Sequence, residues 1–185
     1  MRIVTGKYKG RHFVVPASFK ARPTTDFAKE NLFNVLRAYI DFEGTRALDL
    51  FAGTGAITLE LLSRGCEQVV SVEKDRRHFR FIADTIRTLR DPHARPLCGD
   101  ALRYIQRASE AFDLVFADPP YALPELPELP QRVMQSTLVA PDGLFVLEHG
   151  RTNDLSTHPD FVTHRENGSV NFSYFRHQGQ PDASL

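Results

Sequence analysis

Four consecutive residues, Asp118-Pro119-Pro120-Tyr121, follow the apolar run 112–117 and could hold a planar amine. Each proline has a fixed φ and no N–H to donate, so the carbonyl of Pro119 is left free to accept a hydrogen bond. One N–H of a nucleobase amine can then donate to the Asp118 carboxylate and the other to that carbonyl, while the Tyr121 ring stacks on the base. The predicted catalytic residues are therefore Asp118, Pro119, Pro120 and Tyr121. A rigid turn after a buried strand is the alternative for a motif this short.

A glycine-rich turn, Gly53-Thr54-Gly55, lies between an apolar strand and an apolar helix. The two glycines let the backbone turn sharply and approach a ligand closely, and the start of the helix offers free N–H groups. The third glycine of a dinucleotide-binding turn is replaced by Thr58, and no phosphate loop follows. The turn therefore suits a nucleoside ligand without phosphate. The amino-acid end of S-adenosylmethionine could bind there, with Asp49 accepting from its ammonium. An ordinary strand-to-helix turn is the alternative.

Acidic residues also end the next strands along the chain. Glu73 follows strand 68–72, where a doubly wound sheet binds a ribose diol, and Asp100 follows strand 95–98, where it could accept from an adenine amine. Such acids are singly common as helix caps, but four successive strands that each end in a useful polar residue favour a cofactor site. The predicted cofactor-binding residues are Asp49, Phe51, Gly53, Thr54, Gly55, Glu73, Lys74, Asp100 and Ala101.

A parallel sheet is needed to bring these residues together. The apolar pattern alternates between strands at 46–51, 68–72, 95–98 and 112–117 and helices at 56–64, 75–90 and 101–109. This pattern is typical of an α/β fold with helices on both faces of the sheet. A further strand at 144–148 is followed by strands at 160–164 and 169–176, which a short turn makes antiparallel. We therefore expect a mostly parallel, seven-stranded, Rossmann-like sheet with a reversed last strand.

Two segments flank this framework, and an unusual repeat lies within it. Residues 1–40 predict a basic appendage made of a small hairpin, with strands 2–5 and 11–15, and a helix that starts at Thr24-Thr25. Residues 41–177 form the main domain, and residues 178–185 are expected to be a disordered tail. Leu-Pro-Glu is repeated between Leu123 and Pro130, which favours extended polyproline structure with Pro130 opening the next helix.

Charge is unevenly distributed along the chain. Its 185 residues hold 23 basic and 23 acidic side chains, yet residues 1–25 contain six basic residues and no acid. This asymmetry favours a polyanion partner, although a solvated basic hairpin is also compatible with it. The predicted RNA-binding residues are Arg2, Lys7, Lys9, Arg11, Arg22 and Thr24.

Composition excludes several other classes of protein. The hydrophobic content of 42% is that of a globular chain, and no apolar run approaches the length of a membrane span. Cys66 and Cys98 are isolated and lack metal-ligand spacing, so we expect no metal site. A cytoplasmic location is expected, because there is no secretory signal pattern.

With these motifs in hand, the chain resembles the RsmD family of bacterial 16S rRNA guanine-N2 methyltransferases, over about residues 2 to 176. Its most distinctive match is the signature Arg22-Pro23-Thr24-Thr25-Asp26, followed by Glu30 and Leu32-Phe33-Asn34. The glycine turn, Glu73, Asp100-Ala101 and Asp118-Pro119-Pro120-Tyr121 match the family's cofactor and catalytic motifs in order. Phe27 departs from the family, which commonly has Arg there, and so does Asn167, where Tyr is usual.

The resemblance implies a fold and an activity. The fold would be that of an S-adenosylmethionine-dependent methyltransferase, and the activity would be methylation of the exocyclic N2 amine of a guanine in 16S rRNA. The family is understood to act within the assembled small ribosomal subunit, and we expect a monomer. The catalytic motif itself does not distinguish this amine from adenine N6 or cytosine N4 in DNA. A non-catalytic RNA-binding assembly factor is the alternative from another class.

Overall fold

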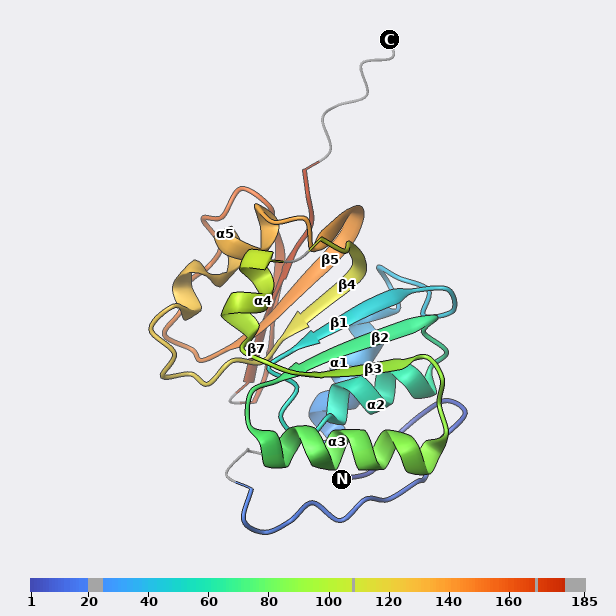
Figure 1. The fold of residues 1–185 in the computed structure, drawn as a ribbon. Helices are drawn as coiled ribbons and strands as arrows, with labels where there is room; N and C mark the ends of the chain where they lie inside the picture. Colours follow the sequence, from blue (N-terminus) through green and yellow to red (C-terminus); the bar gives the residue numbers. More distant parts are fainter. Residues whose placement is uncertain (20–24, 108, 169, 179–185) are drawn as a thin grey trace.

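The computed structural model describes residues 1–19, 25–107, 109–168 and 170–178. A seven-stranded sheet forms its centre (Figure 1). The strands are β1 (Arg46–Leu50), β2 (Gln68–Glu73), β3 (Ala94–Cys98), β4 (Phe112–Ala117), β5 (Val139–His149), β6 (Phe161–Asn167) and β7 (Val170–Phe175). The helices are α1 (Asp26–Leu36), α2 (Ala56–Ser63), α3 (Arg76–Leu89), α4 (Ala101–Arg107) and α5 (Leu129–Met134), with a short 3₁₀ helix η1 (Leu126–Glu128).

The strand order is β3-β2-β1-β4-β5-β7-β6. The first five strands of this order pair in parallel, and β7 pairs antiparallel with both β5 and β6. The expected mostly parallel sheet with a reversed last strand is therefore confirmed. The order changes direction between β1 and β4, so the loops after these two strands leave the sheet to opposite sides of one crevice.

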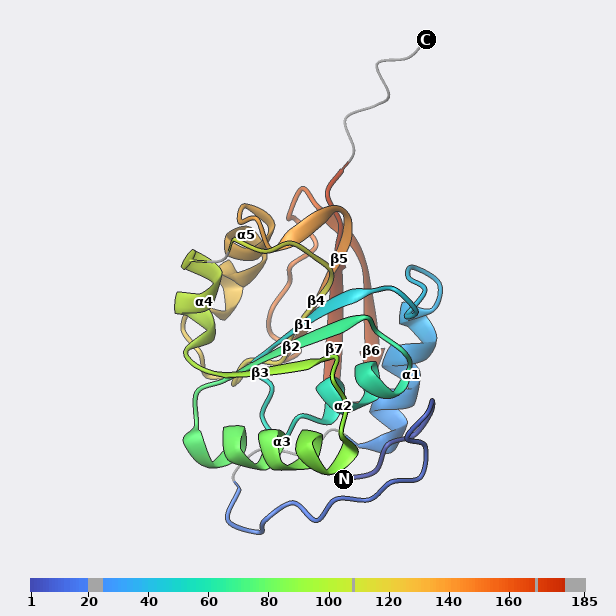
Figure 2. The same cartoon turned by 45° about the vertical axis from the view of Figure 1, so that its right-hand side comes forward.

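Two apolar layers cover the sheet. Helices α1, α2 and α3 lie over one face, and α4 and α5 lie over the other (Figures 1 and 2). Side chains of the central strands alternate between them: Ala47, Leu114 and Phe116 pack in the first layer, and Leu48 and Val115 pack in the second. This alternation is the period-two pattern of strands buried on both faces.

Most predicted elements lie within two residues of their observed bounds, but β5 starts at Val139, five residues before the predicted strand. The predicted N-terminal hairpin strands are wrong. Residues 2–5 and 11–15 form a hairpin with a single β-bridge, between Arg2 and His12, within the described residues. The amides of Val4 and Thr5 instead donate to the Glu60 carboxylate of α2, at 2.9 and 3.0 Å. A side chain from another element has thus taken the donors that a longer ladder would need.

Gly6 explains why this hairpin can lie so close to α2. Its φ is +87°, and a Cβ built there would lie 1.9 Å from the carbonyl oxygen of Ser63. The amide of Lys7 donates to that same oxygen at 2.7 Å. Only glycine permits this approach of two backbones.

The expectation of polyproline structure for the Leu-Pro-Glu repeat is also wrong. The segment folds into η1 and runs directly into α5, with Pro127 and Pro130 in the first turns of the two helices, where a missing N–H costs nothing. Leu126 and Leu129 are buried. The amides of Leu126 and Glu128 donate to the carbonyls of Leu123 and Glu125 at 3.1 and 3.0 Å. Such bonds between residues three apart define a 3₁₀ turn and are absent from polyproline structure. Pro130 does open the following helix, as predicted.

Candidate active site

The polar residues predicted from the strand ends lie at one edge of the sheet. Asp49 is in β1, Glu73 ends β2, Asp100 follows β3 and Asp118 follows β4. These four strands are neighbours and run parallel. The carboxyl ends of parallel strands in an open α/β sheet form the ligand crevice. The fold therefore brings the candidate cofactor and catalytic residues together.

The glycine turn after β1 has an unusual backbone. Phe51, Gly53 and Gly55 all have positive φ, at 61°, 57° and 77°. A positive φ in a bulky residue such as Phe51 is strained, and strain of this kind concentrates at ligand sites. Gly55 precedes the first residue of α2, and a Cβ built on it would lie 3.0 Å from Cγ1 of Ile82 in α3. The turn thus packs against α3 in a way that excludes a side chain.

Glu73 connects the end of β2 with this turn. One carboxylate oxygen accepts from the amide of Gly53 at 2.7 Å, and the other accepts from the amide of Asp75 at 2.6 Å. Each oxygen has a second lone pair available for a ligand. Glu73 is therefore held in one orientation at the point where the sequence predicts a ribose diol.

Asp49 lies beneath the turn and is only 1% exposed. One of its oxygens, Oδ2, accepts from the backbone amide of Thr58 at 3.0 Å and from the Thr58 hydroxyl at 2.6 Å. Burial raises the pKa of Asp49 to about 7, and the hydrogen bonds from Thr58 oppose that rise. As the predicted acceptor for a ligand ammonium, Asp49 would therefore form that hydrogen bond while buried.

Asp100 and Lys74 face each other across the ends of β3 and β2. Lys74 Nζ lies 2.9 Å from Asp100 Oδ2, and the other carboxylate oxygen accepts from the amide of Arg103 at 3.1 Å. The bond to Lys74 lowers the pKa of Asp100, so this residue is an anion at neutral pH. Ala101 is buried at the start of α4.

The catalytic motif after β4 includes a partner that the sequence did not single out. The Tyr121 hydroxyl donates to Oε1 of Glu148 at 3.0 Å, and Glu148 lies near the end of β5, the strand that pairs with β4. Burial and the charge of Glu148 raise the pKa of Asp118 well above its usual range, with a further contribution from Asp49. Burial likewise raises the pKa of Glu148. The sequence signal for Glu148 was its place at the end of an apolar strand.

Tyr121 remains accessible in this arrangement. Its side chain is among the exposed large ones, at 43%. On its other side the ring lies against Gly150, where an added Cβ would be 3.5 Å from Cδ2 of Tyr121. The ring can therefore present a face to a planar ligand while Glu148 fixes its hydroxyl end.

The predicted RNA-binding residues lie in different surroundings. Lys9 and Arg11 are exposed on the hairpin, Lys7 pairs with Asp91 at 3.0 Å, and Arg2 pairs with Asp26 at 2.8 Å. Arg22 and Thr24 lie outside the described residues. Tyr8 packs locally and donates to Asp91 at 2.9 Å, so it is not an exposed stacking residue.

Within the described ranges, no group of three or more His, Cys, Asp or Glu residues is arranged to hold a metal ion. In the same part of the chain, no helix is both long enough and apolar enough to cross a membrane.

A parallel sheet with a glycine turn after β1, an acid after β2 and Asp-Pro-Pro-Tyr after β4 defines a Rossmann-like, S-adenosylmethionine-dependent methyltransferase. Comparison with known proteins then identifies the family. The family model described as "Conserved hypothetical protein 95" matches residues 1–176. "Ribosomal RNA small subunit methyltransferase D" of Escherichia coli K12 is 33% identical over 188 residues, which cover 99% of this chain and 94% of the relative. The chain therefore belongs to the RsmD family, as its signature indicated.

Two further relatives agree. The Haemophilus influenzae protein of the same name is 29% identical over 182 residues, covering 96% of this chain and 93% of the relative. The structure of a hypothetical protein from Thermus thermophilus superimposes with a TM-score of 0.82 at 32% identity, and the match covers 95% of this chain and 99% of the other. These similarities extend over the whole fold and are not confined to the cofactor motifs.

Proposed function

We propose that this protein transfers a methyl group from S-adenosylmethionine to the exocyclic N2 amine of a guanine in 16S rRNA. The observation that carries the proposal is the set of Asp118, Tyr121 and Glu148 beside the glycine turn, in a family whose curated members are named as small-subunit rRNA methyltransferases. We also propose that the RNA is recognised within the small ribosomal subunit, and that the enzyme acts as a cytoplasmic monomer.

The residues at the strand ends fit the methyl donor. Glu73 is oriented by two backbone amides and keeps lone pairs for a ribose diol. The strained Phe51 and the left-handed glycines bring backbone close to a ligand, and Asp100, an anion held by Lys74, can accept from an adenine amine. When bound, the donor supplies an electrophilic methyl group on a sulfonium sulfur.

The acceptor amine is a poor nucleophile, because its lone pair is delocalised into the ring. Hydrogen bonds from its two N–H groups to the Asp118 carboxylate and the Pro119 carbonyl would favour a pyramidal nitrogen and aim its lone pair. Orientation of this kind supplies a large part of catalysis in transfer reactions. Tyr121 would stack on the base after it leaves its surroundings.

The same geometry places a proton acceptor beside the reacting amine. Formation of the bond between the nitrogen and the methyl carbon would be matched by cleavage of the carbon–sulfur bond, with a neutral thioether as the leaving group. The nitrogen would then be cationic and would have to lose one proton. The Asp118 carboxylate, already bonded to one of the N–H groups, is positioned to take that proton. Its raised pKa makes it a better acceptor than an ordinary aspartate. Glu148 contacts Asp118 and also accepts a hydrogen bond from the Tyr121 hydroxyl.

The decisive experiment is transfer of labelled methyl from S-adenosylmethionine to small subunits that lack the modification, followed by nucleoside mass spectrometry. N2-methylguanosine should appear and should be absent with Asp118→Ala, which should still bind the cofactor. Naked 16S rRNA and adenine-containing DNA are tested beside the subunits. Methylated adenine or cytosine in DNA, or normal turnover by Asp118→Ala, would refute the proposal. Absence of S-adenosylmethionine binding would favour a non-catalytic assembly factor.

A further inference from the structure

Two adjoining cavities lie where the N-terminal hairpin meets α1. The first has a volume of about 380 Å³ and is lined by Arg2, Ile3, Val4, Thr5, Lys9, Gly10, Glu30, Asn34, Arg37 and Arg64. The second, of about 600 Å³, shares Thr5, Arg37 and Arg64 with it. We call the cavity surface formed by Arg2, Lys9, Arg37 and Arg64 the basic pocket. These volumes are in the range of ligand sites.

Four cations, which define the basic pocket, line the first cavity together with the carboxylate of Glu30. Arg2 and Arg64 are paired with Asp26 and Glu60, and the adjoining cavity is lined by Asp41 and Glu43. Glu30, Asn34 and Arg37 recur at the spacing that places side chains on one side of a helix. Lys9 and Arg37 are exposed, and among the described residues neither has an ion pair with a carboxylate. These two charges are therefore available to an external anion.

Arg64 gives the basic pocket a buried charge. Its side chain is only 6% exposed and pairs with Glu60 at 3.1 Å, while its guanidinium lies over the Phe33 ring at 4.3 Å. Its Nε atom is buried and has no hydrogen-bond partner in the described part of the chain. A buried donor without a partner costs free energy. Burial lowers the pKa of Arg64, Glu60 opposes that shift and the nearby charge of Arg37 adds to it; an anion beside the two guanidinium groups would offset their repulsion.

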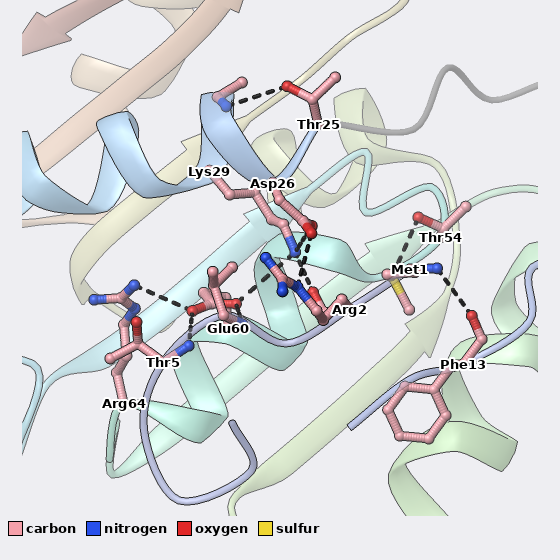
Figure 3. A network of polar contacts seen from close by, with 12 residues as sticks. Met1, Arg2, Thr5, Phe13, Thr25, Asp26, Lys29, Thr54, Glu60 and Arg64 are labelled. Carbon is pink, nitrogen blue, oxygen red and sulfur yellow. Dashed lines mark hydrogen bonds and ion pairs between the residues drawn. The ribbon is translucent and has the colours of Figure 1, made fainter. Parts of the chain in front are cut away.

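A polar network makes the wall of the pocket rigid (Figure 3). The Glu60 carboxylate accepts from the amides of Val4 and Thr5 and pairs with Arg64. Lys29, 1% exposed, lies between Glu60 and Asp26 and donates to the carbonyl of Arg2. Because Glu60 and Lys29 are already engaged, an incoming anion would meet Lys9, Arg37 and Arg64 without having to reorganise the hairpin.

Arg2 links one end of the pocket to the glycine turn. Arg2 follows Met1, whose sulfur lies 3.7 Å from the Thr54 hydroxyl in the glycine turn. Figure 3 shows Arg64 at the opposite end of this network from Thr54. Arg37 and Arg64, the C-caps of α1 and α2, lie at the end of the pocket away from that turn.

We propose that the basic pocket binds backbone phosphates of the substrate RNA, at nucleotides outside the one that enters the catalytic motif. The inference deepens the proposed function and rests on RNA being the substrate. Guanidinium groups match phosphate oxygens in geometry and charge. Arg37 and Arg64 thereby join the hairpin residues Arg2 and Lys9 in the RNA interface, and neither was predicted from the N-terminal charge asymmetry.

The test is the salt dependence of binding to 16S rRNA transcripts by wild type, Arg37→Gln and Lys9→Gln/Arg37→Gln. Both side chains are exposed, so these variants should fold normally. Each lost phosphate contact should reduce the slope of log affinity against log salt by about 0.7–0.9. The double variant should bind RNA about tenfold more weakly at roughly 0.15 M salt, with unchanged affinity for S-adenosylmethionine. The matched control is Arg107→Gln, an exposed cation on α4 at the opposite face of the sheet, which should leave the slope unchanged.

An unchanged slope in the double variant would overturn the proposal. So would saturable binding of inorganic phosphate to the pocket combined with an unchanged RNA slope, because the pocket would then be a small-anion site. The proposed function is judged separately by methyl transfer. Normal transfer with an unchanged slope would reject the pocket alone. If the salt dependence of RNA binding depends on Arg37 but no RNA is methylated, the proposed reaction is rejected and the phosphate-binding role of the pocket stands.

Discussion

The hydrogen bond between Tyr121 and Glu148 offers a direct test of the proposed site. Tyr121→Phe keeps the ring that would stack on the base and removes only the hydroxyl that donates to Glu148 at 3.0 Å. Glu148 is 7% exposed, so the lost donor is not fully replaced by solvent. The variant thus removes the bond that fixes the hydroxyl end of the ring, which lies against Gly150.

The expected magnitude follows from the type of bond. A hydrogen bond to a charged group contributes about 1.5–3 kcal/mol, and a tenfold change in rate corresponds to about 1.4 kcal/mol. Tyr121 is 43% exposed, which places its contribution at the lower end. We therefore expect kcat/KM for the RNA to fall about tenfold. Tyr121→Ala should lose more, because base stacking on an aromatic ring contributes about 1–3 kcal/mol.

The assay is steady-state methyl transfer with cofactor affinity measured separately. Affinity for S-adenosylmethionine should not change, since Tyr121 is not among the residues that hold the cofactor. Tyr104→Phe is the control, because that tyrosine lies on α4 and outside the catalytic motif. A double-mutant cycle with Glu148→Gln should show coupling between the two positions. Wild-type kinetics for Tyr121→Phe, or simple additivity in the cycle, would refute the reasoning.

Three further predictions concern ionisation and the glycine turn. Because burial and Glu148 raise the pKa of Asp118, kcat/KM should fall as the pH drops through that raised pKa, and Glu148→Gln should move the fall to lower pH; an unmoved profile would contradict the coupling. Gly55→Ala should destabilise the fold by roughly 1–2 kcal/mol in urea titrations, since its φ is +77°, whereas Gly99→Ala, with open space around it, should be neutral. Burial raises the pKa of Asp49 from 3.8 to about 7, so the stability from its protonation is full below 3.8 and is lost as the pH rises through about 7. Asp49→Asn should remove that part of the decline between about pH 4 and 7, and an equal decline in both proteins would count against it.

The parallel framework could be predicted because its strands are buried on both faces. Such strands appear as short apolar runs, and the intervening helices have their own period, so the alternation gives the fold class directly. The order in which acids end these strands then places Glu73, Asp100 and Asp118 at one edge without any knowledge of strand order. That part of the site depends only on chain direction in a parallel sheet.

The errors arose where one pattern fits two conformations. A three-residue repeat of Leu and Pro is compatible with polyproline structure and with 3₁₀ turns, since both have three residues per turn. The backbone hydrogen bonds donated by Leu126 and Glu128 decide between them. In the hairpin, the position of residues 2–5 before a turn bounded by Gly6 and Gly10 predicted a strand, but Glu60 of α2 binds the amides of Val4 and Thr5. Contacts between segments far apart in sequence cannot be seen in local periodicity.

Glu148 shows the same limit within the site. Its place at the end of a strand was evident, but its role depends on β5 lying next to β4 and on the orientation of Tyr121 toward it. Arg64 is a similar case, since its burial against Phe33 and Glu60 results from the packing of α1 on α2. Glu148 and Arg64 therefore become functional candidates only when their neighbours in the folded structure are known.

The acids at the strand ends also bear on which group of a base the site accepts. Asp49, Asp118 and Glu148 come from the adjacent strands β1, β4 and β5 and their ends, and burial with the charges of Glu148 and Asp49 raises the pKa of Asp118. In the anionic form that the proposed reaction needs, the Asp118 carboxylate only accepts hydrogen bonds. With the Pro119 carbonyl added, a base that presents an amine would satisfy acceptors already in place. A base that presents a carbonyl there would leave buried acceptors unpaired, a penalty of about 1–3 kcal/mol per group. Guanine would therefore enter with its N2 edge toward Asp118 and its O6 edge away. The site would select an amine both by attracting it and by excluding the alternatives.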